Sequence, residues 1–366
     1  MRGAHTRCSL RANPPYRGMN AQQRWNEGGS KGVSAATWLC YAIGMPPPLE
    51  PAPRVRVVVL NHNGGERVVR CLDALARTDW PKHALEIVLV DNASTDGSDT
   101  RAIAAHPRVV VMRTPENIGF PANNVALRDL RDVAFVALVN NDAYVEPGWL
   151  APLVDALASD STLGAVNSLV MFANETTPTV NNAGNEVLVN GYGRDRGFGA
   201  TDLDMYAHDA DVFAWCGAAV LLRPGYLADV GLFDERFFLY YEDTDLSWRG
   251  RLRGWRYRCI PASRVRHDHA ASAVSGSPLQ LFYTERNRLL MLAKCAPMSL
   301  AASAIVRFPL STLSYAAHGD LRRAWVHTRA FGSFVCLVPS SLRERRRVRR
   351  RRSVDDADVL VLLTNV

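Results

Sequence analysis

Residues 133–144 read VAFVALVNNDAY, and this stretch decides the fold. It opens with a nearly unbroken apolar, β-branched run that is short enough for a strand buried on both faces of a sheet. Asn140, Asn141 and Asp142 follow at the strand's carboxyl end, just outside which open α/β sheets bind their ligands. A carboxylate flanked by amides suits a hard divalent cation, Mg²⁺ or Mn²⁺, together with substrate phosphates. The same residues also serve as turn chemistry that stops a strand.

Strands and helices alternate on the amino-terminal side of this stretch. The apolar pattern predicts strands at Val55–Leu60, Glu86–Val90 and Val109–Met112, with helices around Val68–Leu75 and at Ala122–Leu130. Strands that alternate with helices of about ten residues form βαβ units and a parallel sheet. The fold class we expect is therefore α/β, with a mostly parallel central sheet flanked by helices.

The pattern is looser on the carboxyl-terminal side. We expect helices at Trp149–Ser159 and Leu279–Lys294, a loop entering a helix over Phe233–Gly254, and three strands: Gly164–Met171, Val212–Leu222 and Arg256–Ile260. Asn174–Asp211 is polar and rich in glycine. It is too long for an ordinary connection, and we interpret it as a flap that faces the substrate.

The two ends of the chain differ in composition from its middle. Residues 1–53 lack periodicity and end in a proline-rich linker, so we expect a disordered extension, with Met45 as an alternative start to Met1. Residues 295–342 mix apolar and basic residues, which is typical of amphipathic helices that pack on the domain or lie at a membrane surface. Residues 343–366 begin with eight arginines among ten residues and form an Arg-rich tail.

Composition excludes several classes of protein. Of the 366 residues, 48% are hydrophobic, which is typical of a globular chain, and the net charge of +7 comes from the arginine run. A basic tail suits anionic lipid head groups, whereas no motif for nucleic-acid recognition is present. Seven scattered cysteines without a CxxC pair argue against a disulfide framework or a zinc site. The absence of an apolar run of about 18 residues and of a signal pattern predicts a cytoplasmic protein, peripheral at the inner membrane surface.

Polar residues follow the other expected strands. Asp91, after the second strand, can accept the N3–H of uracil or thymine, although Asp and Ser in DNASTDGS also suit a helix cap. Asn61 ends the first strand and could line the same nucleotide pocket. In the 116–124 segment ENIGFPANN, Gly119 permits close backbone approach and the next helix offers its amino terminus to phosphate.

A second acidic cluster lies in the 233–249 segment FDERFFLYYEDTDLSWR. Glu242, Asp243 and Asp245 stand between aromatic residues just before an expected helix, where acids commonly complement the helix dipole. Crowded carboxylates near apolar surface also raise one another's pKa toward a value useful for a general base. His267 or His269, after the last strand, could supply an imidazole to the cation.

Eight segments in one order resemble the family 2 glycosyltransferases of GT-A fold, in particular their rhamnosyltransferase-like branch. The resemblance covers roughly residues 55–292 and includes the segments already quoted, with VVVLNHNG at the first strand, WCGAAVLLRP at 215–224, the H-x-x-A-x-S of 267–272 and YTERN at 283–287. It implies inverting transfer of a sugar from a nucleotide-diphosphate donor to a hydroxyl. One departure stands out, because Asn140 replaces the first acid of the family's DxD motif.

The resemblance also implies a role for each matching residue. Asp243 is the catalytic base, and Asp142 and His267 hold the metal. The remaining residues fall into two groups, donor-nucleotide contacts (Asn61, Asp91, Asn92, Asn117, Asn140, Asn141) and acceptor contacts (Gly217, Glu242, Arg286).

The domain organisation and partners follow from this resemblance. Residues 54–294 form the glycosyltransferase domain, with a nucleotide-sugar half (54–145) and an acceptor half (146–294). We expect L-rhamnose from dTDP-rhamnose as donor, a lipid-linked or cell-envelope glycan as acceptor, and no nucleic-acid partner. A UDP-hexose donor, a sugar nucleotidyltransferase and a non-catalytic glycan-binding protein are the alternatives.

Overall fold

The structure is a computed structural model that describes residues 51–268 and 276–365. The chain divides into two compact units, Met1–Pro53 and Arg54–Val366, and the fold below is that of the second. The expectations for residues 1–50, including the start at Met45, lie outside the described residues. So do His269 and the end of the H-x-x-A-x-S segment.

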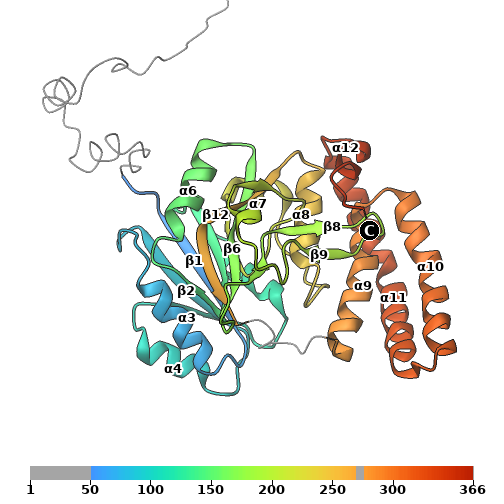
Figure 1. Ribbon diagram of the computed structural model, residues 1–366, viewed down its shortest axis with the longest axis horizontal. Helices are drawn as coiled ribbons and strands as arrows, with labels where there is room; N and C mark the ends of the chain where they lie inside the picture. Colours follow the sequence, from blue (N-terminus) through green and yellow to red (C-terminus); the bar gives the residue numbers. More distant parts are fainter. Residues whose placement is uncertain (1–50, 269–275, 366) are drawn as a thin grey trace, which may run out of the picture. The chain divides into compact units, whose positions relative to one another are not determined.

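The amino-terminal half builds a parallel sheet, as predicted (Figure 1). Its strands stand in the order β4-β1-β2-β3, and every neighbouring pair is parallel. The elements are β1 (Val55–Asn61), α3 (Glu66–Ala76), β2 (Leu85–Asp91), α4 (Ser98–Ala105), β3 (Val110–Arg113), η2 (Phe120–Asn123), α5 (Asn124–Leu127) and β4 (Phe135–Asn140). This parallel arrangement brings the carboxyl ends of β1, β2 and β4 to one edge.

The second half extends this sheet with antiparallel pairs. Strand β11 runs antiparallel to β4 and β6, and β12 runs parallel to β6. The elements are β5 (Ala143–Val145), α6 (Leu150–Ser159), β6 (Leu163–Phe172), β7 (Val180–Asn182), β8 (Asn185–Val187), β9 (Gly193–Asp195), η3 (Asp204–Tyr206), β10 (Ala210–Asp211), β11 (Ala219–Leu222), α7 (Pro224–Val230), α8 (Glu242–Arg251) and β12 (Arg256–His267). The sheet is therefore mixed, but β6 and β12 run in the same direction as β4 because β11 is antiparallel to both β4 and β6, so their carboxyl ends lie at the same edge.

Helices cover both faces of the sheet. Alternate residues of β1 point to opposite sides, so that Val57 and Val59 pack in the core under α3 and α6, while Val58 packs in the core with α7 and α8. Four helices follow at the carboxyl-terminal end: α9 (Pro278–Cys295), α10 (Met298–Ala317), α11 (Leu321–Arg351) and α12 (Asp356–Leu360). They form a third core with α8, in which Trp248 and Phe334 are fully buried.

Three sequence predictions of element length were wrong. The strand expected at Val212–Leu222 is a strand only from Ala219, because the carbonyls of Val212 and Phe213 accept hydrogen bonds from the Arg251 guanidinium instead of a continuous ladder. Strand β12 runs on to His267, past a register irregularity after Ile260 that accommodates the proline there. The helix expected at Ala122–Leu130 is a short 3₁₀ turn followed by one turn of α-helix.

The arginine run forms the last turns of α11 and is not a separate tail. Arg349 forms an ion pair with Asp356 and Arg351 with Asp229, and the Thr364 amide donates to the Val187 carbonyl. The carboxyl-terminal residues are thus packed against the domain. Among the described residues, the helices fall short of the length and apolarity needed to cross a bilayer.

Candidate active site

Asp91 and Asn61 end neighbouring parallel strands and meet there, as predicted. They are paired in the register of β1 and β2, and both are buried. The Asn61 side-chain amide donates to Asp91 Oδ1 at 3.1 Å and to the Ser94 and Ser98 hydroxyls at 3.0 Å. One Asp91 oxygen also accepts from the Ser94 amide at 3.3 Å, which leaves acceptor capacity on the carboxylate for a ligand.

Asn92 and Asn117 hold the next loop in place. Asn92 Nδ2 donates to Asn117 Oδ1 at 2.8 Å and to the Gly119 carbonyl at 3.1 Å. Asn92 Oδ1 accepts from the Thr114 hydroxyl at 2.9 Å and the Ile118 amide at 3.0 Å. Asn117 Oδ1 also accepts from the Gly119 amide at 2.9 Å. These asparagines shape the 114–119 loop. Only the side-chain polar atoms that these bonds do not use are available for direct contact with a nucleotide.

The Asn-Asn-Asp segment lies beside the same edge. Asn141 Nδ2 donates to Asn61 Oδ1 at 3.2 Å, and the Asn140 amide donates to the Ala218 carbonyl at 3.0 Å. Asp142 is buried, and its Oδ1 lies 3.1 Å from His267 Nε2. His267 reaches it because β12 pairs antiparallel with β5, which places His267 opposite Ala143.

The Asp142–His267 pair is the most suitable place for a cation in the described part of the chain. A carboxylate oxygen and an imidazole nitrogen face each other, and His267 Nδ1 lies 3.0 Å from Asn181 Oδ1, which orients the ring. Within residues 51–268 and 276–365, no group of three or more His, Cys, Asp or Glu side chains could hold a metal ion. Two protein donors are nevertheless enough where substrate phosphates complete the shell.

Asp243 is a partly buried carboxylate with a proton affinity suited to base catalysis. Its Oδ2 accepts from Asn185 Nδ2 at 3.1 Å and from the Gly217 amide at 3.3 Å, and its Oδ1 accepts from the Thr244 amide at 2.6 Å. Burial raises the pKa of Asp243 to about 6, although these hydrogen bonds hold it down in part. The residue is therefore ionised at neutral pH and still basic enough to take a proton.

Glu242 lies next to this base and is buried. Burial, and then the neighbouring Asp243 charge, raise the pKa of Glu242 well above its usual value. Its Oε2 has no hydrogen-bond partner among the described residues. A buried, unpartnered carboxyl oxygen beside a base is available to an incoming hydroxyl group.

A strained loop delivers both acids to the site. Phe238, Tyr240 and Tyr241 have φ values of 63°, 66° and 68°, a left-handed conformation that is costly for side chains of this size. Asn287 on α9 holds the loop, since its Nδ2 lies 2.8 Å from the Phe237 and Tyr240 carbonyls and 2.7 Å from that of Leu239. The hydrogen bonds from Asn287, which lies outside the loop, thus offset the cost of this strained conformation.

Arg286 supports the same loop. Its guanidinium donates to the Arg236 carbonyl at 2.6 Å and the Phe237 carbonyl at 3.0 Å, and it stacks over the Tyr283 ring at 4.7 Å. With these bonds made and the side chain largely buried, Arg286 has little left to offer an acceptor. The structure assigns it a positioning contact in place of the predicted acceptor contact.

The predicted acids are connected by a series of hydrogen-bonded side chains with two steps along the backbone, from Asn141 to Asp142 and from Asn181 to Asn182. Asp91 bonds to Asn61, Asn61 to Asn141, and the neighbouring Asp142 bonds to His267. His267 bonds to Asn181, and the next residue of β7, Asn182, bonds to Asn185 at 2.7 Å, which bonds to Asp243. The structure therefore brings together residues that are up to 152 positions apart in the sequence, 91 and 243.

Sequence reasoning missed the asparagines of residues 181–185 and Asn287. The 174–211 segment was correctly singled out for its composition, but its polar residues lacked a signal that would pick out Asn181 or Asn185 before their partners were known. The prediction for Asp245 as part of the acidic cluster at the site was wrong. Asp245 is fully buried away from ligands, in ion pairs with Arg249 at 2.9 Å and Lys294 at 2.7 Å.

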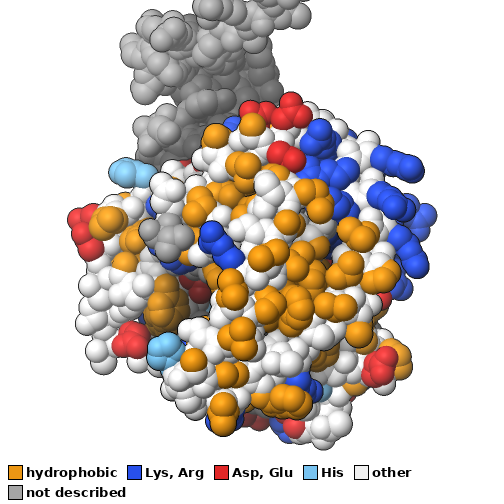
Figure 2. All heavy atoms as spheres, turned by 90° about the vertical axis from the view of Figure 1, so that its right-hand side faces the viewer, with side chains coloured by type: hydrophobic (Ala, Val, Ile, Leu, Met, Phe, Trp, Pro, Cys, Tyr) orange, Lys and Arg blue, Asp and Glu red, His pale blue; other side chains and the backbone are white. Residues whose placement is uncertain are grey.

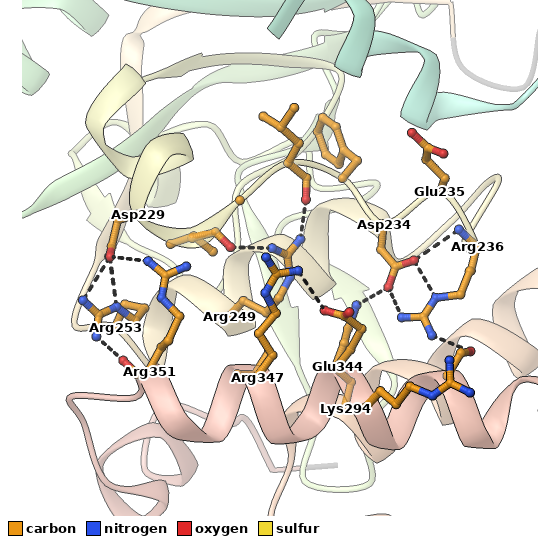
Figure 3. A pocket seen from close by; sticks show the side chains of 17 residues that line it. Asp229, Asp234, Glu235, Arg236, Arg249, Arg253, Lys294, Glu344, Arg347 and Arg351 are labelled. Carbon is orange, nitrogen blue, oxygen red and sulfur yellow. Dashed lines mark hydrogen bonds and ion pairs between the residues drawn. The ribbon is translucent and has the colours of Figure 1, made fainter. Parts of the chain in front are cut away.

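A separate cavity of about 740 Å³ lies between the 229–236 loop and α11 (Figure 3). It contains none of the predicted site residues, and most of its charges pair with one another. Asp229 bonds to Arg253 at 2.9 Å, and Asp234 bonds to Lys294 at 2.6 Å. Asp229 also pairs with Arg351 at 3.5 Å, which joins α11 to the domain, and the cavity is distinct from the site at the sheet edge.

Comparison with known proteins agrees with this fold. Residues 56–215 match the family model described as glycosyl transferase family 2. The chain is 27% identical over 237 residues to N-acetylglucosaminyl-diphospho-decaprenol L-rhamnosyltransferase of Mycobacterium tuberculosis, covering 59% of this chain and 76% of that protein. It is 28% identical over 236 residues to the O-antigen biosynthesis protein RfbC of Myxococcus xanthus, covering 62% of this chain and 18% of that protein.

The fold is shared with a solved glycosyltransferase structure. GalNAc-T7, crystallised with UDP, GalNAc and Mn²⁺, superposes with a TM-score of 0.54 at 18% identity. The match covers 66% of this chain, which spans about half (48%) of the length of GalNAc-T7. With the sheet, the acids at its edge and the family match in agreement, residues 56–215 form a glycosyl transferase family 2 domain, and the chain is similar to a rhamnosyltransferase.

Proposed function

We propose that this glycosyltransferase moves L-rhamnose from dTDP-L-rhamnose, with inversion, to a hydroxyl of a lipid-linked or cell-envelope glycan. A nucleotide-sugar donor follows from the family. The rhamnose and the lipid-linked acceptor are drawn from the relative named a rhamnosyltransferase acting on a decaprenol-linked substrate. Because Asp91 would accept N3–H from thymine and uracil alike, a UDP-hexose is the alternative donor.

The observation that carries this proposal is the series of side chains from Asp91 to Asp243. This series supports a site with three parts: Asp91 for the base of the donor, Asp142 and His267 for a cation, and Asp243, whose pKa is raised, for the acceptor. Sugar transfer from a nucleotide diphosphate needs these three functions in that order, for the nucleotide, the diphosphate and the acceptor hydroxyl.

Asp243 is the proposed base. It takes the proton of the acceptor hydroxyl as that oxygen forms its bond to the anomeric carbon, and the bond from that carbon to the diphosphate breaks with the electron pair leaving on the nucleoside diphosphate. One base suffices for inversion, whereas an inverting hydrolase needs a paired acid and base. The Gly217 amide, 3.3 Å from Asp243 Oδ2, orients the carboxylate, and Glu242 is free to contact the acceptor.

Asp142 and His267 are the proposed cation ligands. Their donor atoms, a carboxylate oxygen and an imidazole nitrogen, fit Mn²⁺ or Mg²⁺. GalNAc-T7 was crystallised with Mn²⁺, which supports a divalent cation here. A bound cation would stabilise negative charge on the departing diphosphate. Asn140, in place of an acid, leaves the site with one carboxylate and a weaker hold on the metal.

Asn61 and Asp91 are proposed to line the pocket of the donor base, with Asn92 and Asn117 shaping its rim. Asn140 and Asn141 would stand beside the diphosphate, where side-chain amides can donate hydrogen bonds to its oxygens. Acceptor contacts are assigned to Glu242 and to the backbone at Gly217, while Arg286 acts through the loop that precedes them.

The test is to incubate the purified protein with Mn²⁺, a polyprenyl-diphosphate-linked acceptor and a panel of nucleotide sugars. We expect free nucleoside diphosphate, with dTDP-L-rhamnose giving the highest rate. Turnover only with a UDP-hexose would replace the donor and keep the reaction class. Release of pyrophosphate from a sugar phosphate and a nucleoside triphosphate would overturn the proposal in favour of a nucleotidyltransferase.

A further inference from the structure

The outward face of α10 is apolar along the length of the helix. Four large apolar side chains are exposed there, Met298 (58%), Val306 (68%), Leu310 (62%) and Leu313 (66%). Their spacing follows the helical repeat, so they form one stripe. The opposite side of the same helix is also apolar, because Ala304 and Phe308 are buried in the core shared with α9 and α11.

Helix α11 repeats this arrangement. Its exposed apolar side chains are Leu321 (69%), Trp325 (63%), Val335 (50%) and Leu342 (42%), again at helical spacing. Its inner side is buried through Ala330 and Phe334. A helix that is apolar on both sides is expected to be covered on both, and nothing in the described part of the chain covers this outer face.

The exposed stripe of α11 is apolar as far as Leu342 and basic beyond it, on the same face of the helix. Arg346 and Arg350 follow Leu342 at intervals of four residues, and both are exposed. Within the described residues neither forms an ion pair, whereas Arg349 and Arg351 are paired with Asp356 and Asp229. Figure 2, which views this side of the molecule, shows hydrophobic side chains gathered over the face and Lys and Arg gathered along one border.

We propose that this face, formed by the exposed side chains of α10 and α11, docks flat on an anionic lipid bilayer. Apolar side chains would enter the interface between head groups and acyl chains, and the bordering arginines would contact lipid phosphates. Residues 298–351 contain eleven arginines but only two acids, Asp320 and Glu344. This imbalance favours an anionic partner over a second copy of the chain, whose arginines would oppose these.

The docking face also connects to the site. Helix α11 packs along α9, and α9 carries Asn287, which holds the loop in front of Asp243. Docking would therefore bring the site close to a bilayer in which a lipid-linked acceptor lies. The inference that the bilayer holds the acceptor rests on the proposed function, whereas the inference that the face binds vesicles does not.

The first measurement is flotation of the full chain with vesicles. We expect binding to vesicles of phosphatidylcholine with about 30% phosphatidylglycerol, and at least about tenfold weaker binding to pure phosphatidylcholine. Leu310→Ser/Leu313→Ser should lower the partition coefficient about 100-fold. Its control, Met205→Ser/Val361→Ser, removes side chains that are 70% and 79% exposed on other elements and should leave binding unchanged.

A second pair of variants tests the basic border. Arg346→Gln/Arg350→Gln should weaken binding to the anionic vesicles about 30-fold, with a smaller dependence on salt. Arg77→Gln/Arg108→Gln, two exposed arginines of the sheet domain, is the matched control and should bind as the wild type does. Equal losses in both pairs would mean general charge attraction and would overturn the assigned face.

Two further outcomes separate this inference from the proposed function. Transfer to a short, water-soluble acceptor should be equal in the wild type and in Leu310→Ser/Leu313→Ser, and transfer to an acceptor embedded in vesicles should fall in the variant. Normal transfer without vesicle binding would overturn the docking face and keep the enzyme assignment. A wild-type dimer in analytical ultracentrifugation that becomes a monomer in the variant would show that a second copy is the true occupant.

Discussion

Gly119 is the tightest point of contact between the donor half and the acceptor half of the site. Its φ is 73° and its ψ −158°, a region open almost only to glycine. A Cβ at this position would lie 2.0 Å from the Phe238 carbonyl oxygen, a backbone atom that cannot rotate away. The same carbonyl accepts a 2.7 Å hydrogen bond from the Phe120 amide. Gly119→Ala must therefore push the 238–241 loop, and with it Asp243, out of place.

The expected magnitude has two parts. The positive φ costs alanine about 1–2 kcal/mol. Loss of the hydrogen bond between Phe120 and Phe238, which leaves a buried group unpaired, costs about 1–3 kcal/mol more. We expect a loss of about 2–5 kcal/mol in the free energy of unfolding and a fall in turnover of at least about 100-fold, as a displaced base allows.

The matched control is Gly319→Ala, in the turn between α10 and α11. Gly319 also has a positive φ, 81°, but a Cβ there meets nothing within 4 Å. This variant should lose only the first part, about 1–2 kcal/mol, and keep its turnover on a soluble acceptor. The assays are urea denaturation and release of nucleoside diphosphate. Equal stability losses in the two variants, or normal turnover in Gly119→Ala, would refute the reasoning.

Three further predictions concern the loop, the base and the metal. Asn287→Asp keeps the size of the side chain but removes the donor to three carbonyls of the loop, so urea denaturation should show a loss of about 3 kcal/mol. An unchanged midpoint would contradict the contact. The kcat/KM of the wild type should fall as pH drops through about 6. Burial raises the pKa of Asp243 to about 6, and only its ionised form accepts a proton. A profile that is flat down to about pH 5 would argue against this base. Asp142→Ala and His267→Ala should each raise the Mn²⁺ concentration that gives the half-maximal rate at least about tenfold. The assay is a metal titration at saturating donor, and titration curves equal to that of the wild type would place the cation elsewhere.

The local pattern of apolar residues was sufficient to predict the parallel half of the sheet. The β-branched runs of β1, β2 and β4 and the helical spacing of Val68, Cys71, Leu72 and Leu75 correspond to elements whose bounds differ by only a residue or two from those predicted. Asp91, Asp142 and Asn61 could be identified for the same reason, since a polar residue that ends a parallel strand must lie at the ligand edge.

Long-range partners explain what the sequence did not reveal. Residues 212–218 are as apolar as a strand, but the carbonyls of Val212 and Phe213 are bound by Arg251, which is more than 30 positions away. Asn185 and Asn287 are ordinary asparagines until the chain brings Asp243 and the strained 238–241 loop to them. The arginine run gave no sign that alternate members pair with Asp229 and Asp356 while others remain exposed.

The most direct test of the account is the turnover of Asp243→Asn with donor and acceptor at saturation. Asparagine preserves the shape of the side chain, and its single oxygen can still accept from the Thr244 amide, while its NH2 group gives up the bond from the Gly217 amide; the variant should fold and bind donor with wild-type affinity. We predict a loss of at least about 100-fold in kcat that does not recover at any pH. Near-normal transfer by Asp243→Asn would contradict the assignment of the base, and with it the proposed mechanism.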